Sequence, residues 1–259
     1  FGAEGNRNPV WLSGGIERNG QIEWSQPEIL LYSPEKIIGM SYPDLIQANG
    51  CYWTAHTNKT VARINKIDNS LIEGLFHQET AATVPADGLI LESDNCLQTI
   101  DWPVLPGLLA GGGFTVSLRF CCTDLSARGI LLDTRGPTGQ GIVISISDQK
   151  RLKIELIGQR HWVSWDTDPG QIQEGRLHHV TFIVDGAAKV LSVVVDGTLC
   201  DGGTTRTYGW CHIPDELNLV NGSLQAQLGS GFSGTIETVH VFNRYLRTSE
   251  AISLHRACK

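Results

Sequence analysis

The sequence has no run of lysine or arginine, and its 20 basic residues are outnumbered by 27 acidic ones, which gives a formal net charge of -7. A phosphate-neutralising surface has no obvious source, so a nucleic-acid partner is not expected. No apolar run approaches the roughly 20 residues of a membrane-spanning helix, and no membrane span is expected. Phe1 rather than Met opens the sequence without a basic or apolar leader, and we expect a processed piece of a longer protein.

The motifs of several enzyme classes are also missing. The sequence contains no P-loop, dinucleotide-binding glycine motif, G-x-S-x-G or H-E-x-x-H. A retaining glycosidase needs two carboxyl groups close together, whereas Glu155, Glu174, Glu216 and Glu237 are scattered rather than paired at strand spacing. We therefore expect the second part of the chain, where these residues lie, to be non-catalytic.

The 7 cysteines form no C-x-x-C pair, and none has a histidine at zinc-finger spacing, so a structural zinc site is not expected. Two N-glycosylation sequons, at Asn58 and Asn221, combine with the cysteine count to favour an extracellular, secreted protein with two or three disulfides. Cys200 and Cys211 are the best local pair, because the Gly-rich stretch between them can fold back as a hairpin. The odd cysteine would remain free or pair with another chain.

The second part of the chain alternates apolar and polar residues with a period of two, which is typical of strands with one buried face. Asp185-Gly186 and Asp196-Gly197 suit tight hairpin turns. Short strands at such spacing predict an antiparallel all-β sandwich. The only helix expected begins at Thr248 or Ser249, either of which would cap it, and continues to His255. The strands expected in this part cover 114–120, 142–146, 152–156, 180–184 and 190–195.

The first part of the chain has shorter strand-like pieces, each set off by Gly, Asn, Ser or Pro. A stretch of small residues with Pro85, over 77–88, predicts a linker. We therefore expect two domains, 1–85 and 86–259. The strand-like pieces of the first domain lie at 9–12, 28–32, 44–47, 51–57 and 61–67.

Four segments carry a resemblance to a known family: 113–120 (GFTVSLRF), 177–186 (LHHVTFIVDG), 193–197 (VVVDG) and the closing 232–251, which contains Asn243-Arg244-Tyr245-Leu246 before a short helix. With them, residues 89–259 resemble a LamG-like jelly-roll domain of the concanavalin A-like superfamily. The resemblance implies a two-sheet antiparallel sandwich. It also implies the roles common in such domains, which are binding of glycans, binding of calcium, or structural support.

Residues 6–12 (NRNPVWL), a degenerate Asp-box turn over 19–25, and 41–53 (SYPDLIQANGCYW) are similar to the end of a six-bladed, sialidase-type BNR-repeat propeller. In that family a tyrosine attacks the anomeric carbon and three arginines clamp the substrate carboxylate. The resemblance implies that Tyr42 is the nucleophile and Arg7 the third arginine. The remaining catalytic groups would precede Phe1, so the chain alone is expected to be inactive and to need an N-terminal chain from the same precursor, with Cys51 as a candidate link. The alternative is a strand tyrosine and a surface arginine without a catalytic role.

Two groups of aromatic residues are candidates for sugar binding, because flat rings stack on sugars and carboxylates accept their hydroxyls. Trp162 and Trp165 lie three residues apart, followed by Asp166. Tyr208 and Trp210 come shortly before Cys211 in the sequence. The alternative for both groups is that the tryptophans belong to the core of the sandwich.

Metal binding is less well supported. His178 and His179 are neighbours in an expected strand and face opposite ways, so they cannot chelate one ion together. Several aspartates near strand ends leave a calcium site open, but they follow no fixed spacing and no ligands are assigned.

The leading hypothesis is an extracellular, lectin-like protein whose sandwich binds glycans. The second is the C-terminal chain of a sialidase-like exo-glycosidase whose active site is completed by a missing N-terminal chain. The third is a sandwich that only braces the propeller.

Overall fold

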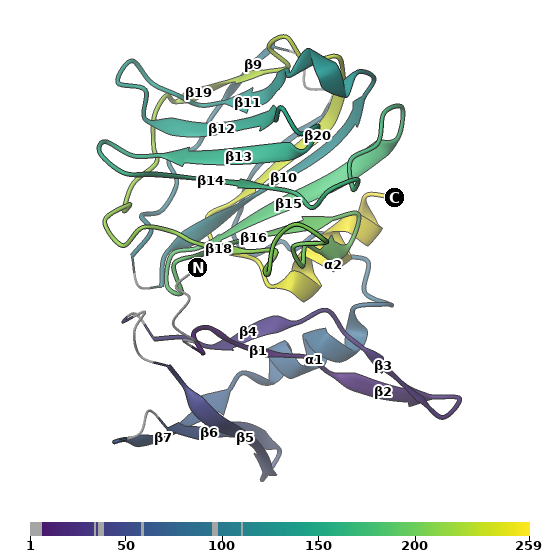
Figure 1. Cartoon of the computed structure of the whole chain (residues 1–259), viewed down its shortest axis with the longest axis vertical. Coiled ribbons are helices and arrows are strands. Elements are labelled where there is room, and N and C mark those ends of the chain that lie inside the picture. The colour runs from purple at the N-terminus through teal and green to yellow at the C-terminus, as the bar shows by residue number, and fades with distance from the viewer. Residues whose placement is uncertain (1–6, 34, 36–38, 58–59, 95–97, 110) are drawn as a thin grey trace.

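Two antiparallel sheets pack face to face in the upper part of the molecule, and three small sheets with one helix lie below them (Figure 1). The computed structural model describes residues 7–33, 35, 39–57, 60–94, 98–109 and 111–259. The predicted all-β class, an antiparallel sandwich preceded by further strands, is confirmed. Neither helix of the described residues is long and apolar enough to cross a membrane.

The larger sheet of the sandwich has seven strands in the order β17-β16-β15-β10-β20-β8, with β18 paired to the same edge of β16 as β17. Its strands are β8 (Leu89–Asp94), β10 (Gly113–Cys122), β15 (Leu177–Asp185), β16 (Val190–Val195), β17 (Thr198–Leu199), β18 (Cys211–His212) and β20 (Gly234–Phe242).

The second sheet has six strands in the order β14-β13-β12-β11-β19-β9. Its strands are β9 (Gln98–Asp101), β11 (Ile130–Asp133), β12 (Gly141–Ile146), β13 (Leu152–Ile157), β14 (Trp162–Asp166) and β19 (Gln225–Leu228). A short 3-10 turn covers Leu125–Ala127.

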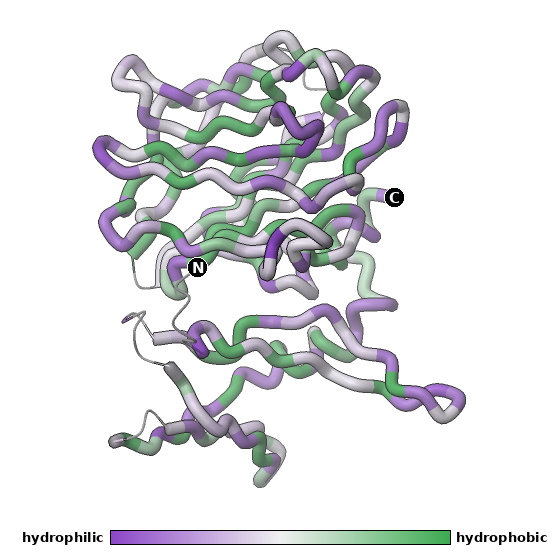
Figure 2. Tube along the Cα trace, viewed as in Figure 1, coloured by the Kyte–Doolittle hydropathy of each residue, from purple (hydrophilic) through white to green (hydrophobic). Residues whose placement is uncertain are grey.

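The core lies between the inner faces of the two sheets. Phe114, Val116, Leu118 and Phe120 of β10 are all 0% exposed, as their alternation predicts. The same alternation appears as green and purple bands along the strands in Figure 2. Full burial of each such side chain contributes about 1.5–3 kcal/mol before the loss of chain entropy is counted, so the sandwich has an extensive core of its own.

The first part of the chain forms small antiparallel sheets. The three strands β5, β6 and β7 form the largest of them, one strand short of the four in a propeller blade. The predicted boundary at residue 85 lies between the helix α1 and β8 and stays a prediction. The paired strands are β1 (Val10–Leu12) with β4 (Glu28–Leu31), β2 (Gly15–Arg18) with β3 (Gln21–Trp24), and β5 (Ser41–Ala48), β6 (Cys51–Thr57) and β7 (Ala62–Ile67) together.

The helix α1 (Asn69–His77) was not expected from the sequence. Asp68 caps it, since its carboxylate accepts a hydrogen bond from the Ser70 N–H at 3.0 Å. Ile72 and Leu75, three residues apart, are buried on one face. An aspartate followed by apolar residues at helical spacing is therefore the signal that could have found this helix.

The helix α2 (Thr248–Ala257) is confirmed, but its predicted cap is wrong. Thr248 and Ser249 lie in its first turn, and their N–H groups donate to the Glu28 carboxylate at 2.8 and 2.7 Å. Glu28 is 3% exposed and comes from β4, about 220 residues earlier in the chain. A distant carboxylate thus replaces the local hydroxyl as the partner of the free N–H groups.

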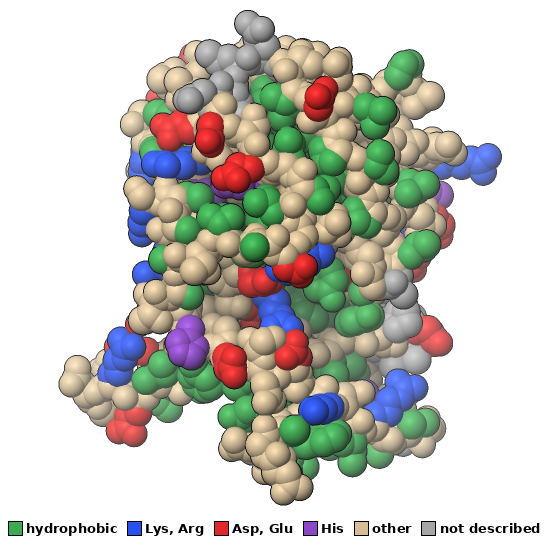
Figure 3. Space-filling model, turned by 180° about the vertical axis from the view of Figure 1, so that it is seen from behind, with side chains coloured by type: hydrophobic (Ala, Val, Ile, Leu, Met, Phe, Trp, Pro, Cys, Tyr) green, Lys and Arg blue, Asp and Glu red, His purple; other side chains and the backbone are tan. Residues whose placement is uncertain are grey.

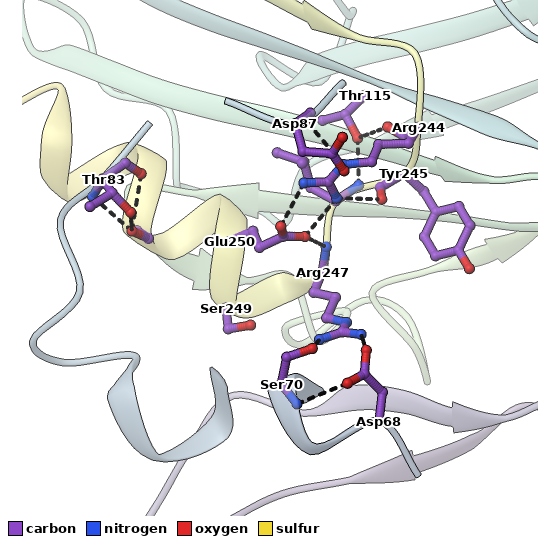
Figure 4. A network of polar contacts seen from close by, with 12 residues as sticks. Asp68, Ser70, Thr83, Asp87, Thr115, Arg244, Tyr245, Arg247, Ser249 and Glu250 are labelled. Atoms are coloured by element: carbon purple, nitrogen blue, oxygen red, sulfur yellow. Dashed lines mark hydrogen bonds and ion pairs between the residues drawn. The ribbon is translucent and has the colours of Figure 1, made fainter. Parts of the chain in front are cut away.

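Further polar contacts join the lower sheets to the sandwich around the start of α2 (Figure 4). The Arg247 guanidinium donates to the Asp68 carboxylate at 2.7 Å and to the Ser70 hydroxyl at 2.8 Å. The Ser253 hydroxyl donates to the Thr83 carbonyl oxygen at 3.1 Å. Acidic and basic side chains gather side by side where the upper and lower parts meet (Figure 3). The junction is therefore polar and specific in its pairing.

The predicted disulfides are absent among the described residues, where all six cysteines are free; Cys96 lies outside these residues. The Gly-rich stretch does fold back, but Cys200 lies beside Val193 and Cys211 beside Leu191 of β16. That register separates the two Cα atoms by about 6.6 Å, which is inside the range of disulfides, yet both thiols are free. Burial raises the pKa of both thiols to about 12.

One of the two sequons has a structural role. The Asn221 side chain donates to the Leu105 carbonyl oxygen and accepts from the Leu105 N–H, both at 2.8 Å. Its amide therefore joins two distant segments of the sandwich. Asn58 lies outside the described residues.

Replacing Glu28 by Gln is expected to change the pH dependence of stability. Burial is the largest influence on the Glu28 carboxyl and raises its pKa above the ordinary 4.5, against the hydrogen bonds from Ser249 and Thr248. Stability contributed by Glu28 is therefore fully present below pH 4.5 and declines as the pH rises through the raised pKa. The measurement is the free energy of urea unfolding at about pH 4, 6 and 8. Relative to the wild type, the free energy of unfolding of Glu28→Gln should increase as the pH rises, by about 1.4 kcal/mol in total for each unit by which the Glu28 pKa is raised.

The matched control is Glu73→Gln, which changes an exposed glutamate of α1. It should follow the wild type at every pH. A stability difference between Glu28→Gln and the wild type that stays constant over this range would contradict the account of Glu28.

Candidate functional site

The outer face of the six-stranded sheet carries a row of mostly polar side chains. The pairing register aligns one residue from each strand, so the row crosses the whole sheet. Along β13, burial alternates, with Lys153, Glu155 and Ile157 on the less buried, outer side. The aligned residues are Ser164, Glu155, Val143, Asp133, Gln227 and Thr99.

Charged groups of both signs are fixed on this face. The Arg135 Nε donates to the Asp133 carboxylate at 2.9 and 3.0 Å, and Lys153 lies 3.2 Å from Glu155. Burial disfavours ionisation of Asp133, but the hydrogen bonds from Arg135 outweigh it and hold the Asp133 pKa below its usual value. Donors and acceptors are therefore held at defined positions on this face.

Trp162 stands at the end of this face on the edge strand β14, and it is 63% exposed. A hollow of about 360 Å³ lies at the turn that precedes Trp162 and is lined by Gln140, by residues 158–161 and by residues 216–219; Trp162 itself is not part of the lining. An exposed ring at the end of a polar row can stack on one sugar while neighbouring sugars make hydrogen bonds.

Trp165 does not share this surface with Trp162. Side chains alternate along β14, so Trp165 turns to the other side and packs against the core. Its Nε1 donates to the Gly209 carbonyl oxygen at 2.9 Å, and the Arg206 Cζ lies 4.1 Å from its ring centre. Trp165 therefore supports the loop 201–210. Asp166, on the outer side, is half-buried, and burial raises its pKa.

Asp168 anchors the same loop. Its carboxylate is 6% exposed and accepts hydrogen bonds from Arg206 Nη2 at 2.7 Å, Asp201 N at 2.8 Å and Gly202 N at 3.1 Å. An ion pair so little exposed holds a Gly-rich loop in one conformation.

Tyr208 and Trp210 form part of a second aromatic group rather than part of the Trp162 surface. Their ring centres lie 5.6 Å apart, and Trp210 lies 5.1 Å from His212 and 6.0 Å from Trp11 of β1. Trp210 thus contacts the first part of the chain. The five predicted sugar-binding residues therefore fall in two places, with Trp162 and Asp166 on the outer face.

Arg7 and Tyr42 are brought together at the start of β5. The Arg7 Cζ lies 5.8 Å from the centre of the Tyr42 ring, which is 80% exposed. Tyr42 also has a positive φ of 52°, unusual for a residue with a side chain. The pair lies on the lower sheets, away from the β14 surface (Figure 1).

No group of three or more His, Cys, Asp or Glu side chains among the described residues is placed to hold a metal ion. His178 and His179 face opposite ways, as predicted. His178 Nδ1 lies 2.9 Å from the Asp196 carboxylate, while His179 Nε2 lies 2.9 Å from the Ser117 hydroxyl. Burial lowers the pKa of His179 to about 3, so this ring is neutral.

Residues 97–252 match the family described as the Concanavalin A-like lectin/glucanases superfamily. A search of curated proteins finds no match. The match covers the sandwich from β9 to the first half of α2.

Three solved structures with similar folds come from sialidases. The leech intramolecular trans-sialidase complexed with 2,7-anhydro-Neu5Ac has 17% identity and a TM-score of 0.48, covering 66% of this chain and 28% of the leech chain. The CBM40 of the Ruminococcus gnavus IT-sialidase, bound to α2,3-sialyllactose, has 15% identity and a TM-score of 0.48, covering 65% of this chain and 100% of the other. The Trypanosoma rangeli sialidase in complex with sialic acid has 13% identity and a TM-score of 0.44, covering 98% of this chain and 54% of the other.

The chain thus spans 28% of the leech enzyme and 54% of the Trypanosoma enzyme. The LamG-like and the sialidase-like resemblance stated from the sequence both recur in these comparisons.

Replacing Asp168 by Asn is expected to loosen the loop 201–210. The substitution removes the charge that pairs with Arg206, which costs about 1.5–3 kcal/mol, so tryptic cleavage after Arg206 should become about tenfold faster or more. The rate is measured by mass spectrometry of timed digests. Asp148→Asn changes an acid whose side chain is 77% exposed and should leave the rate unchanged. Equal cleavage rates in wild type and Asp168→Asn would show that Asp168 does not hold the loop.

Proposed function

The chain belongs to the concanavalin A-like lectin/glucanase superfamily, and on this premise we propose that its sandwich binds carbohydrate on the outer face of the six-stranded sheet, beside Trp162. The observation that carries the proposal is the exposed Trp162 ring, which stands on edge strand β14 at the end of the polar outer face. An apolar ring of this size on a strand edge has no partner in the core and is suited to stack on a sugar face.

The polar row supplies the rest of the recognition. Asp133 and Glu155 accept hydroxyl donors, while Arg135 and Lys153 donate to hydroxyl, carboxylate or N-acetyl oxygens. Each of these charged groups is already paired with a neighbour, so it is held in place before the ligand arrives. A shallow site of this kind binds weakly and gains from several copies acting together. An extracellular location fits this role and is part of the proposal.

A glycan array probed with the 259-residue chain tests this function. We expect binding to one glycan class and a loss of tenfold or more in affinity with Trp162→Ala, the size typical of a central aromatic contact. Trp24→Ala is the matched control, because Trp24 is 66% exposed but lies in β3, outside the sandwich. An array without any bound glycan, or equal binding by wild type and Trp162→Ala, contradicts the proposal.

The contact between Arg7 and Tyr42 favours a second candidate function. Their proximity is what a sialidase-like site requires of a nucleophile and an arginine clamp, and the remaining groups would come from an N-terminal chain of the same precursor.

Hydrolysis of a fluorogenic sialoside separates this candidate from the first. The chain alone should be inactive, and addition of an N-terminal chain from the same gene should restore turnover in the wild type but not in Tyr42→Phe. Tyr52→Phe, which changes a tyrosine of the neighbouring strand β6, should retain the restored activity. Turnover that survives in Tyr42→Phe would exclude Tyr42 as the nucleophile.

A further inference from the structure

A cavity of about 190 Å³ lies between the lower sheets and the sandwich. On one side are Trp11 of β1 and Tyr32, just after β4. On the other side are Asp185 of β15, Ser192 of β16 and Tyr245, which precedes α2. We call this space the junction cavity. It lies on the outer face of the seven-stranded sheet, since Ile183, which also lines it, packs against α2, and it is therefore separate from the Trp162 surface.

Four polar groups in the lining can make further hydrogen bonds. Within the described residues, no hydrogen bond engages the hydroxyls of Tyr32, Tyr245 or Ser192. Asp185 uses one oxygen, Oδ1, to accept the N–H groups of Ala187 and Ala188 at 2.9 and 3.0 Å, which leaves Oδ2 without a partner. Figure 4 shows the Tyr245 ring turned away from the polar network, with no contact drawn at its hydroxyl.

These four groups differ in exposure, and together they line a cavity that opens to solvent on one side. Ser192 and Asp185 are each 6% exposed, and Tyr32 is 40% exposed, so the cavity is deep on the sandwich side and open beside Tyr32. The Asp185 charge acts on both phenols, because it adds to burial in raising the pKa of Tyr32 and of Tyr245. One acceptor and three hydroxyls therefore surround the same small space.

The other charged groups of the lining are already occupied. Glu28 accepts the first N–H groups of α2, and Arg247 donates to Asp68 and Ser70. A ligand in the cavity meets one free carboxylate oxygen, three hydroxyls and the ring of Trp11, without an unpaired cation to attract an anion. Such a lining matches a neutral ring with several hydroxyls on its edge and an apolar face.

We propose that the junction cavity binds a single neutral sugar ring, with its hydroxyls on Asp185, Ser192, Tyr32 and Tyr245 and an apolar face toward Trp11. The size agrees, since about 190 Å³ equals the space of roughly six water molecules, which suits one pyranose and not a chain of sugars. The bound ring would contact the lower sheets and the sandwich at once, so occupancy would tighten the junction. This site does not depend on the surface at Trp162.

Saturation-transfer-difference NMR on the full chain tests the proposal with methyl glycosides of glucose, galactose and mannose as probes. We expect one of them to bind and its affinity to fall about fivefold for each hydroxyl removed by Tyr32→Phe and Tyr245→Phe, and by the product of the two in the double variant. These changes leave the rings in place, so the fold is retained. Tyr52→Phe, at a tyrosine of β6 outside the cavity, is the matched control and should bind like the wild type.

Three results would overturn the proposal. One is the absence of binding by all three glycosides, which means that water alone fills the cavity. Another is binding of tetramethylammonium with an affinity that falls in the double phenylalanine variant while glycoside binding does not change, which identifies a cation site built from aromatic rings and a carboxylate. The third is binding that Trp162→Ala abolishes and the double phenylalanine variant leaves unchanged, which moves the sugar to the outer face of the six-stranded sheet and leaves the proposed function intact.

Discussion

One buried carboxylate fixes how the two parts of this molecule meet. The Glu28 side chain extends from β4 and accepts hydrogen bonds from the first N–H groups of α2. The start of a helix of the sandwich is therefore bound to a residue of the lower sheets. Arg247, the N-cap residue of α2, donates to Asp68 at the same junction. Glu28, Asp185 and Tyr245 all line the junction cavity, so the cavity lies directly beside this contact.

The strands of the sandwich were predictable because each of them has one side in a single deep core. Phe114 to Phe120 alternate with polar residues without a break, and Leu152 to Leu156 of the second sheet do the same. Local sequence patterns predicted less well where a residue distant in sequence supplies the contact. Thr248 and Ser249 have the residue types of a helix cap, yet Arg247 is the N-cap residue and a glutamate outside the sandwich accepts their N–H groups. No sequence pattern links residues so far apart.

The candidate sugar-binding residues were predicted from their residue types, and the geometry of the sheet decides which of them share a face. Trp162 and Trp165 are three positions apart, an odd number, so a strand must place them on opposite faces. That parity could have been read from the sequence once β14 was recognised as a strand. The role of Trp210 could not, because its neighbour Trp11 comes from the other part of the chain. The polar row from Ser164 to Thr99 was equally hidden, since its members are adjacent only through the register of six strands.

The separation between Glu28 and α2 also has a consequence for the order of events during synthesis. A ribosome makes β4 first and the start of α2 about 220 residues later. Until then the Glu28 carboxylate has no helix to cap and remains hydrated, and the lower sheets lack the surface against which they finally pack. The first turn of α2 therefore joins two segments of the chain that are synthesised far apart in time.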